Sequence, residues 1–186
     1  FIPSISYSLI EVDITRGNLN PLPISVSPLF ADKVSNSLLK NDIKIENLGL
    51  KIADVVENNL RQTGLFNPLS RKAFLQKPDI AHLKPRFEDW ALIKAQALIT
   101  GKVTNVDGKL RVEFRLWDVL AAKEMIAIAF TTVPDNWRRV GHIITDKVYE
   151  RLTGEKGYFD TRIIYVSEEG PKVQRVKKLA IMDQDG

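Results

Sequence analysis

The chain of 186 residues contains no cysteine and only two histidines. Without cysteine, the chain can form no disulfide, no thiolate zinc site and no cysteine nucleophile. The lack of cysteine does not identify the compartment, because it suits the periplasm and the cytosol equally. Apolar runs that approach the ~20 residues of a membrane-spanning helix are also missing. We therefore expect no direct insertion into a membrane.

The composition that remains is typical of a globular protein. Hydrophobic residues make up 44% of the chain and charged residues 27%, which is enough apolar material for a core. The 27 basic and 23 acidic residues leave a net charge of +4, a small excess without a massive basic patch. At this length we expect one domain, or one domain and part of another.

Both ends of the sequence suggest a piece of a longer protein. The chain lacks a starting Met, and residues 1–8 form an apolar stub that ends in Ser6-Tyr7-Ser8, a small-x-small pattern typical of signal-peptidase sites. We predict that residues 1–8 are the remnant of a signal peptide and that the mature protein begins at Leu9. The alternative is a frayed start or a first β-strand. At the other end, residues 183–186 form a tight-turn sequence that should lead into another strand.

The first half of the chain alternates strand and helix patterns. Residues 9–16 alternate apolar and polar side chains, as in a half-exposed strand, and Gly17 ends the pattern. A polar surface excursion is expected over residues 31–46. Gly64 follows the expected 48–63 helix at the position of a C-terminal cap. The remaining expected elements are strands at 24–30 and 65–70 and a helix at 86–94 with Trp90 and Ile93 as inward anchors.

The strongest local signal is a β-hairpin. Residues 97–106 and 109–118 flank Asp107-Gly108, a pair that tolerates the positive φ angles of a type I′ turn. Four apolar residues of the second strand should share one buried face: Leu110, Val112, Phe114 and Leu116. A third strand is expected at 124–133, with Ile126, Ile128 and Phe130 aligned.

A helix follows, and we expect the side chain of Asp135 to cap its first amides. Its apolar stripe comprises Trp137, Val140, Ile144, Val148 and Leu152, and Gly154 ends it. Strands are then expected at 159–167 and 176–182. These patterns predict an α/β (α+β) fold, with a mixed β-sheet packed by helices up to about Thr153. The last ~30 residues lack a covering helix and are expected to belong to another unit.

The sequence contains none of the common catalytic motifs. The ten glycines form no dinucleotide, P-loop or hydrolase-elbow motif. His82 and His142 have no ligand-like neighbours; His142 is expected to be a partly buried or surface residue. Glu168-Glu169 is read as a solvated turn, and Asp183 and Asp185 as a turn rather than a calcium loop. We therefore predict no enzyme, no cofactor, no metal and no catalytic residue.

A nucleic-acid-binding module is the alternative of another class, with an unrecognised hydrolase behind it. Lys109, Arg111, Arg115 and Trp117 would share one outer strand face, which offers cations and a stacking ring. Glu113 lies in the middle of that row, and the modest net charge argues against strong phosphate binding. We expect no nucleic-acid partner.

Several longer strings resemble the TolB family of the Tol-Pal cell-envelope system. They are PISVSPL at 23–29, NLRQTGLFNPL at 59–69, TGKV at 100–103, WRRVGH at 137–142 and YERLTGEKGYFDTRIIYV at 149–166. The resemblance covers nearly the whole chain, from about Leu9 to Gly186.

The resemblance implies an exported α/β domain followed by a β-propeller. It divides the chain into a signal remnant at 1–8, an N-terminal arm and linker at 9–22, the TolB N-terminal α/β domain at 23–156 and an incomplete propeller at 157–186. It implies a monomeric, non-catalytic periplasmic adaptor that supports outer-membrane integrity, protein transport and cell division. The implied partners are TolA, through the N-terminal segment, and Pal, mainly through the missing propeller.

In the family, the N-terminal segment is called the TolB box and can also fold back onto the propeller. By the match of Gly17 and Pro23, the box here comprises Leu9, Ile10, Glu11, Val12, Asp13, Ile14, Thr15, Arg16, Gly17, Asn18, Leu19 and Asn20. Glu11, Asp13 and Arg16 depart from the familiar pattern. An extended segment with free backbone groups can add a strand to a partner's sheet. The alternative is that 9–16 is an ordered edge strand of its own domain.

Overall fold

The computed structural model describes residues 10, 20–31, 45–172 and 174–185. The predicted signal remnant and most of the predicted TolB box lie outside these residues. Among the described residues, no helix is both long and apolar enough to cross a bilayer.

The main sheet is mixed, as predicted, with strand order β3-β1-β4-β5-β6. Parallel pairing joins β1 (Leu22–Val26) to β3 (Phe66–Pro68) and β4 (Ala97–Val106), and β2 (Phe30–Ala31) also pairs with β4. The strands β5 (Lys109–Asp118) and β6 (Lys123–Thr132) continue the sheet in antiparallel fashion.

The predicted hairpin is confirmed at its turn and along its ladder. Asp107 has φ 52° and Gly108 has φ 76°, the positive angles that a type I′ turn requires. All four residues of the predicted inner face of β5 are at most 1% exposed.

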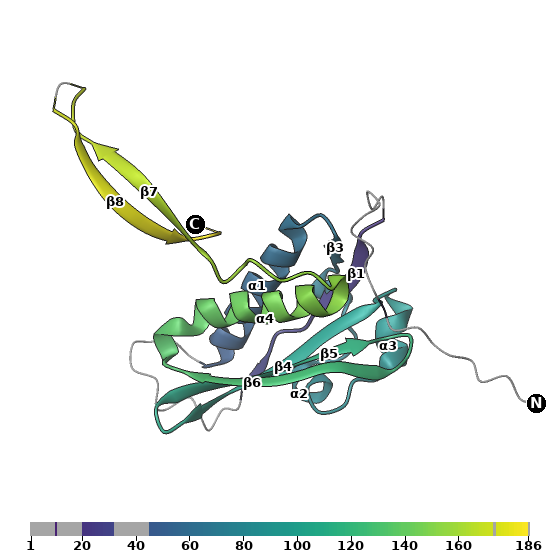
Figure 1. Cartoon of the computed structure of the whole chain (residues 1–186). Coiled ribbons are helices and arrows are strands. Elements are labelled where there is room, and N and C mark those ends of the chain that lie inside the picture. Colours follow the sequence, from purple (N-terminus) through teal and green to yellow (C-terminus); the bar gives the residue numbers. More distant parts are fainter. Residues whose placement is uncertain (1–9, 11–19, 32–44, 173, 186) are drawn as a thin grey trace, which may run out of the picture.

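Two helices cover one face of the sheet (Figure 1). They are α1 (Ile45–Gln62) and α4 (Trp137–Thr153), and their apolar stripes form the main core with the inner faces of β4 and β5. Gly64 and Gly154 end these helices with φ 70° and 76°, as expected of left-handed caps. The two helices can pack closely because Gly141 has no side chain: a Cβ at this position would lie only 2.7 Å from Val55 Cγ1.

A second, smaller core lies on the other face of the sheet. It is covered by α2 (Pro78–Ala81) and α3 (Phe87–Leu92), which follow the 3-10 turn η2 (Arg71–Ala73). Trp90 is 1% exposed and donates its indole hydrogen to Gln76 Oε1 at 3.0 Å. Trp90 is therefore the anchor that the sequence predicted, and Ile93 packs beside it. The helix α2 was not predicted from the sequence, because its four residues are too few to show a helical period.

Three predictions about chain segments were wrong. Glu168 and Glu169, which we predicted in a turn, are the last two residues of β7 (Arg162–Glu169). Asp135 does not cap α4: it lies inside the 3-10 turn η3 (Pro134–Asn136), the residue at the cap is Asn136, and no side-chain cap hydrogen bond forms. Phe159 is not in a strand, because β7 begins only at Arg162; instead its ring is 1% exposed and packs in the main core. The apolar residue that we assigned to a strand anchors the chain below α4.

The last strands form a separate two-stranded sheet. β7 (Arg162–Glu169) pairs in antiparallel register with β8 (Val176–Asp183). The hairpin extends away from the main sheet (Figure 1). Most of its large apolar side chains are exposed, including Leu179 at 79% and Ile164 at 67%.

Candidate functional site

The predicted N-terminal arm enters the described structure at Ile10 and Asn20. The Ile10 amide donates to Asp118 Oδ2 at 3.3 Å, and the side chain of Ile10 is half-buried against the main core. The other ten residues of the predicted TolB box lie outside the described residues.

Asp118, at the end of β5, holds this point of the arm. Asp118 is 1% exposed, and its other carboxylate oxygen, Oδ1, accepts a hydrogen bond from the Ala121 amide at 2.9 Å. A buried carboxylate that accepts hydrogen bonds from two backbone amides is held in a fixed position. Asp118 lies 108 positions from Ile10, so no local sequence pattern predicted this contact.

The second candidate region is the junction between α4 and the β7–β8 hairpin. Asp146, on α4, accepts the amides of Phe159 and Asp160 at 2.7 and 3.1 Å. Arg139 makes a two-oxygen contact with Asp160, from Nε at 2.9 Å and from Nη2 at 3.0 Å. The hydrogen bond to Asp160, and then its charge, raise the pKa of the Arg139 guanidinium. This set of contacts, which we call the root contact, holds residues 157–160 on the helix.

The end of β8 returns to the α1–α4 face and contacts it a second time. His142 and Asn59 are 2% and 0% exposed, and Asn59 Nδ2 lies 2.9 Å from His142 Nδ1. Gln184 Nε2 donates to Asn59 Oδ1 at 3.1 Å, and Arg138 Nη2 donates to Asp185 Oδ2 at 2.7 Å. We call this set, together with Asp185 and His142, the return contact.

Only part of the return contact could be predicted from the sequence. His142 is more deeply buried than the partly buried or surface position we expected. Asn59 and Arg138 were not predicted, because α1, α4 and β8 bring the members of this contact together from distant positions. Asp185 lies in a turn after β8, as predicted, but Asp183 is the last residue of the strand and not part of the turn. His82 stacks on Phe30 with ring centroids 4.4 Å apart.

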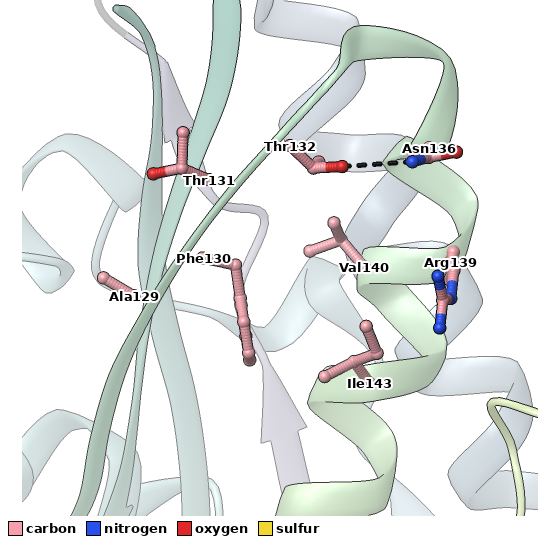
Figure 2. Close-up of a pocket in the computed structure, with 8 residues that line it drawn as sticks. All are labelled: Ala129, Phe130, Thr131, Thr132, Asn136, Arg139, Val140 and Ile143. Atoms are coloured by element: carbon pink, nitrogen blue, oxygen red, sulfur yellow. Dashed lines mark hydrogen bonds between the residues drawn. The ribbon is translucent and has the colours of Figure 1, made fainter.

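A groove of about 360 Å³ lies between β6 and α4. Figure 2 shows Phe130, Val140 and Ile143 around its apolar part, with the Thr132–Asn136 hydrogen bond at one end. Among its described lining residues, the one ionisable side chain is Arg139, which Asp160 neutralises. This lining offers no acid–base pair for catalysis.

The basic row on β5 is largely neutralised. Arg111 pairs with Glu113 at 3.0 Å, and Arg115 pairs with Glu124 at 3.0 Å. Trp117 donates to Thr100 Oγ1 at 2.9 Å and packs edge-on against Phe87, so its ring is already engaged. These contacts weaken the nucleic-acid alternative, which needs free cations and an accessible ring.

The fold and its contacts define a helix-covered α/β domain with a hairpin held on its outer helices. The family model of the TolB amino-terminal domain matches residues 10–125, and the match ends within β6. The chain belongs to the TolB family.

Two relatives extend the comparison. The Tol-Pal system protein TolB of Pelagibacter ubique (strain HTCC1062) is 77% identical over 185 residues, covering 100% of this chain and 42% of that protein. The crystal structure of TolB from Acinetobacter baumannii has a TM-score of 0.66 at 22% identity, covering 90% of this chain and 37% of that one. The second likeness shows the fold. The chain thus spans less than half of either relative, and its family agrees with the prediction of a non-catalytic protein.

Proposed function

We propose that this chain is part of a periplasmic, monomeric, non-catalytic adaptor of the Tol-Pal system. The observation that carries the proposal is the 77% identity, along the whole chain, to a relative named as the Tol-Pal system protein TolB. The partners are TolA, bound by the arm Leu9–Asn20, and Pal, bound mainly by propeller blades that would follow residue 186. Such an adaptor supports outer-membrane integrity and envelope constriction at cell division.

The arm acts by strand addition. In an extended conformation its alternating residues would give one apolar and one polar face, and its backbone groups could pair with the edge of a partner's sheet. The contact of Ile10 with Asp118 supports a docked state in which part of the arm is occupied by its own domain. Release from Asp118 would then precede or accompany TolA binding, so the docked state lowers the apparent affinity.

The β7–β8 hairpin begins the propeller in this proposal. Its exposed apolar residues support this assignment, since an isolated two-stranded sheet is marginal in water and needs further strands or a cover. The corresponding domain boundaries are 1–8, 9–22, 23–156 and 157–186.

Deletion of residues 9–20 tests the arm in the natural protein that carries this chain. We expect binding of purified TolA to be lost in calorimetric titration. The thermal midpoint should be nearly unchanged, because Ile10 adds only a half-buried side chain to a large core.

Asp118→Ala should act in the opposite direction. With the docked state weakened, we expect tighter TolA binding in the same titration, and Glu150→Gln on the surface of α4 serves as the control.

Undiminished TolA binding after deletion of residues 9–20 would refute the arm as the binding element.

A further inference from the structure

The β7–β8 hairpin is held on the domain at two places of unequal quality. The root contact includes a buried ring, since Phe159 is 1% exposed. It also satisfies both carboxylate oxygens of Asp146 with backbone amides. A Cβ on Gly157 would lie 2.3 Å from Asp146 Oδ1, so the backbone passes directly over that side chain. Breaking the root would expose apolar surface and leave charged groups unpaired.

The hydrogen-bond directions in the return contact follow from its neighbours. Thr145 Oγ1 donates to the Gly141 carbonyl at 2.9 Å, so it accepts from Asn59 Nδ2 at 3.2 Å. The Asn59 amide nitrogen therefore faces His142 Nδ1, which accepts. The neutral imidazole then carries its proton on Nε2.

This proton faces the carboxylate at the end of β8 without reaching it. His142 Nε2 and Asp185 Oδ1 are 3.5 Å apart, and both atoms are buried without a hydrogen-bond partner in the described structure. A buried polar atom left unpaired costs about 1–3 kcal/mol. Release of Asp185 would allow water to solvate both atoms. This hydration offsets part of the free energy needed to break the return contact.

We propose that the return contact is a latch. Closed, Asn59, His142 and Arg138 hold Gln184 and Asp185 on the α1–α4 face and fix the direction of the hairpin; open, the hairpin stays attached through the root alone. The chain after residue 185 continues directly from the latch. Whether the latch is closed or open therefore sets how that following chain is oriented relative to the domain. The inference goes beyond the proposed partners and does not depend on them.

A metal site is the competing use of the same atoms. His142, Asp183 and Asp185 offer ligand atoms within 4.8 Å of one another. Arg138 lies 2.7 Å from Asp185 and 3.9 Å from Asp183, and Arg162 lies 4.0 Å from Asp183. These guanidinium groups neutralise the carboxylates. A ligating histidine also donates its second nitrogen's proton, whereas His142 Nδ1 accepts. The contacts therefore favour the latch.

Spin labels can measure the latch directly. Because these 186 residues contain no cysteine, Lys109→Cys and Lys172→Cys place one label on the sheet and one near the tip of the hairpin. Pulsed electron paramagnetic resonance then gives the distribution of distances between them. We expect a single narrow population in the otherwise unchanged natural protein, and a second, displaced population in Asp185→Ala.

Two further variants make the result decisive. Gln184→Ala removes the bond to Asn59 without touching a charge and should add the same second population; it decides the outcome if Asp185→Ala does not fold. Glu168→Gln is the matched control, since Glu168 pairs with Arg175 and Lys177 within the hairpin; it should leave the distribution unchanged. A distribution unaltered in both latch variants would overturn the proposal. Evidence of a metal would also overturn it. That evidence would be a distance distribution that becomes narrower when zinc is added, broadens again with EDTA and does not respond to zinc in Asp185→Ala.

Discussion

The β4–β5–β6 ladder and the β7–β8 ladder are built from similar residues but differ in burial. Both are antiparallel, and both contain β-branched and aromatic side chains. In β5, Phe114 is 1% exposed beneath α1 and α4, whereas Leu179 in β8 is 79% exposed. The difference is the helix layer: main-sheet side chains reach across to an apolar stripe, and hairpin side chains face solvent on both sides.

This comparison shows that apolar strand composition specifies a ladder but not its cover. The main sheet carries its cover within the same chain, at α1 and α4. Among the described residues, the hydrogen bonds that hold the hairpin on the domain lie near its two ends, in the root and return contacts. An isolated two-stranded sheet is marginally stable in water, so the exposed apolar faces of the hairpin would be stabilised by additional strands or another covering element.

The largest expected effect separates the two ladders. Phe114→Ala should lower the free energy of unfolding by about 3–5 kcal/mol, because it leaves a cavity in a closed core. Leu179→Ala should change it by less than about 0.5 kcal/mol, because the side chain is already hydrated. Urea unfolding of the 186-residue chain measures both.

The same pair of variants can contradict the comparison. Equal losses in the 186-residue chain would mean that the hairpin is covered there. A loss for Leu179→Ala that arises only in the longer natural protein would support covering by additional strands.

A smaller effect is expected at the junction between the regions. Gly157→Ala should destabilise the fold by about 1–3 kcal/mol, because its new Cβ would lie 2.5 Å from the Asp146 Cα, which cannot rotate away. Gly154→Ala is the matched comparison. Its new Cβ meets nothing within 4 Å, so its cost of about 1 kcal/mol comes from the positive φ. Thermal unfolding would rank them, and a harmless Gly157→Ala would contradict the close approach.

The smallest effect is expected within the hairpin. Glu169 and Lys178 pair at 2.9 Å with side chains 65% and 59% exposed. An exposed pair contributes little after solvent screening. Glu169→Gln should therefore shift the free energy of unfolding by less than about 0.5 kcal/mol in the same urea assay. A clearly larger loss would show that the hairpin relies on its ion pairs rather than on its backbone ladder.

Local sequence signals predicted most of the fold. The Asp107-Gly108 turn, the alternation of β5 and the helical stripe of α4 each depend on residues within one element, so their periods can be read directly. The errors arose where neighbours along the chain were uninformative. Asp135 has the chemistry of a cap but lies one residue too early. Phe159 looks like the start of a strand in the sequence, but its ring is buried in the main core.

The sequence by itself determined most of the longer strands and helices, their apolar faces and, through long family strings, the TolB resemblance. Tertiary structure alone decided that Asp118 meets Ile10 and that Asn59, His142 and Asp185 share one buried contact. The physical reason is range: secondary structure reflects bonds between near neighbours, whereas these contacts form only after packing places side chains more than 40 residues apart within a few ångströms of each other.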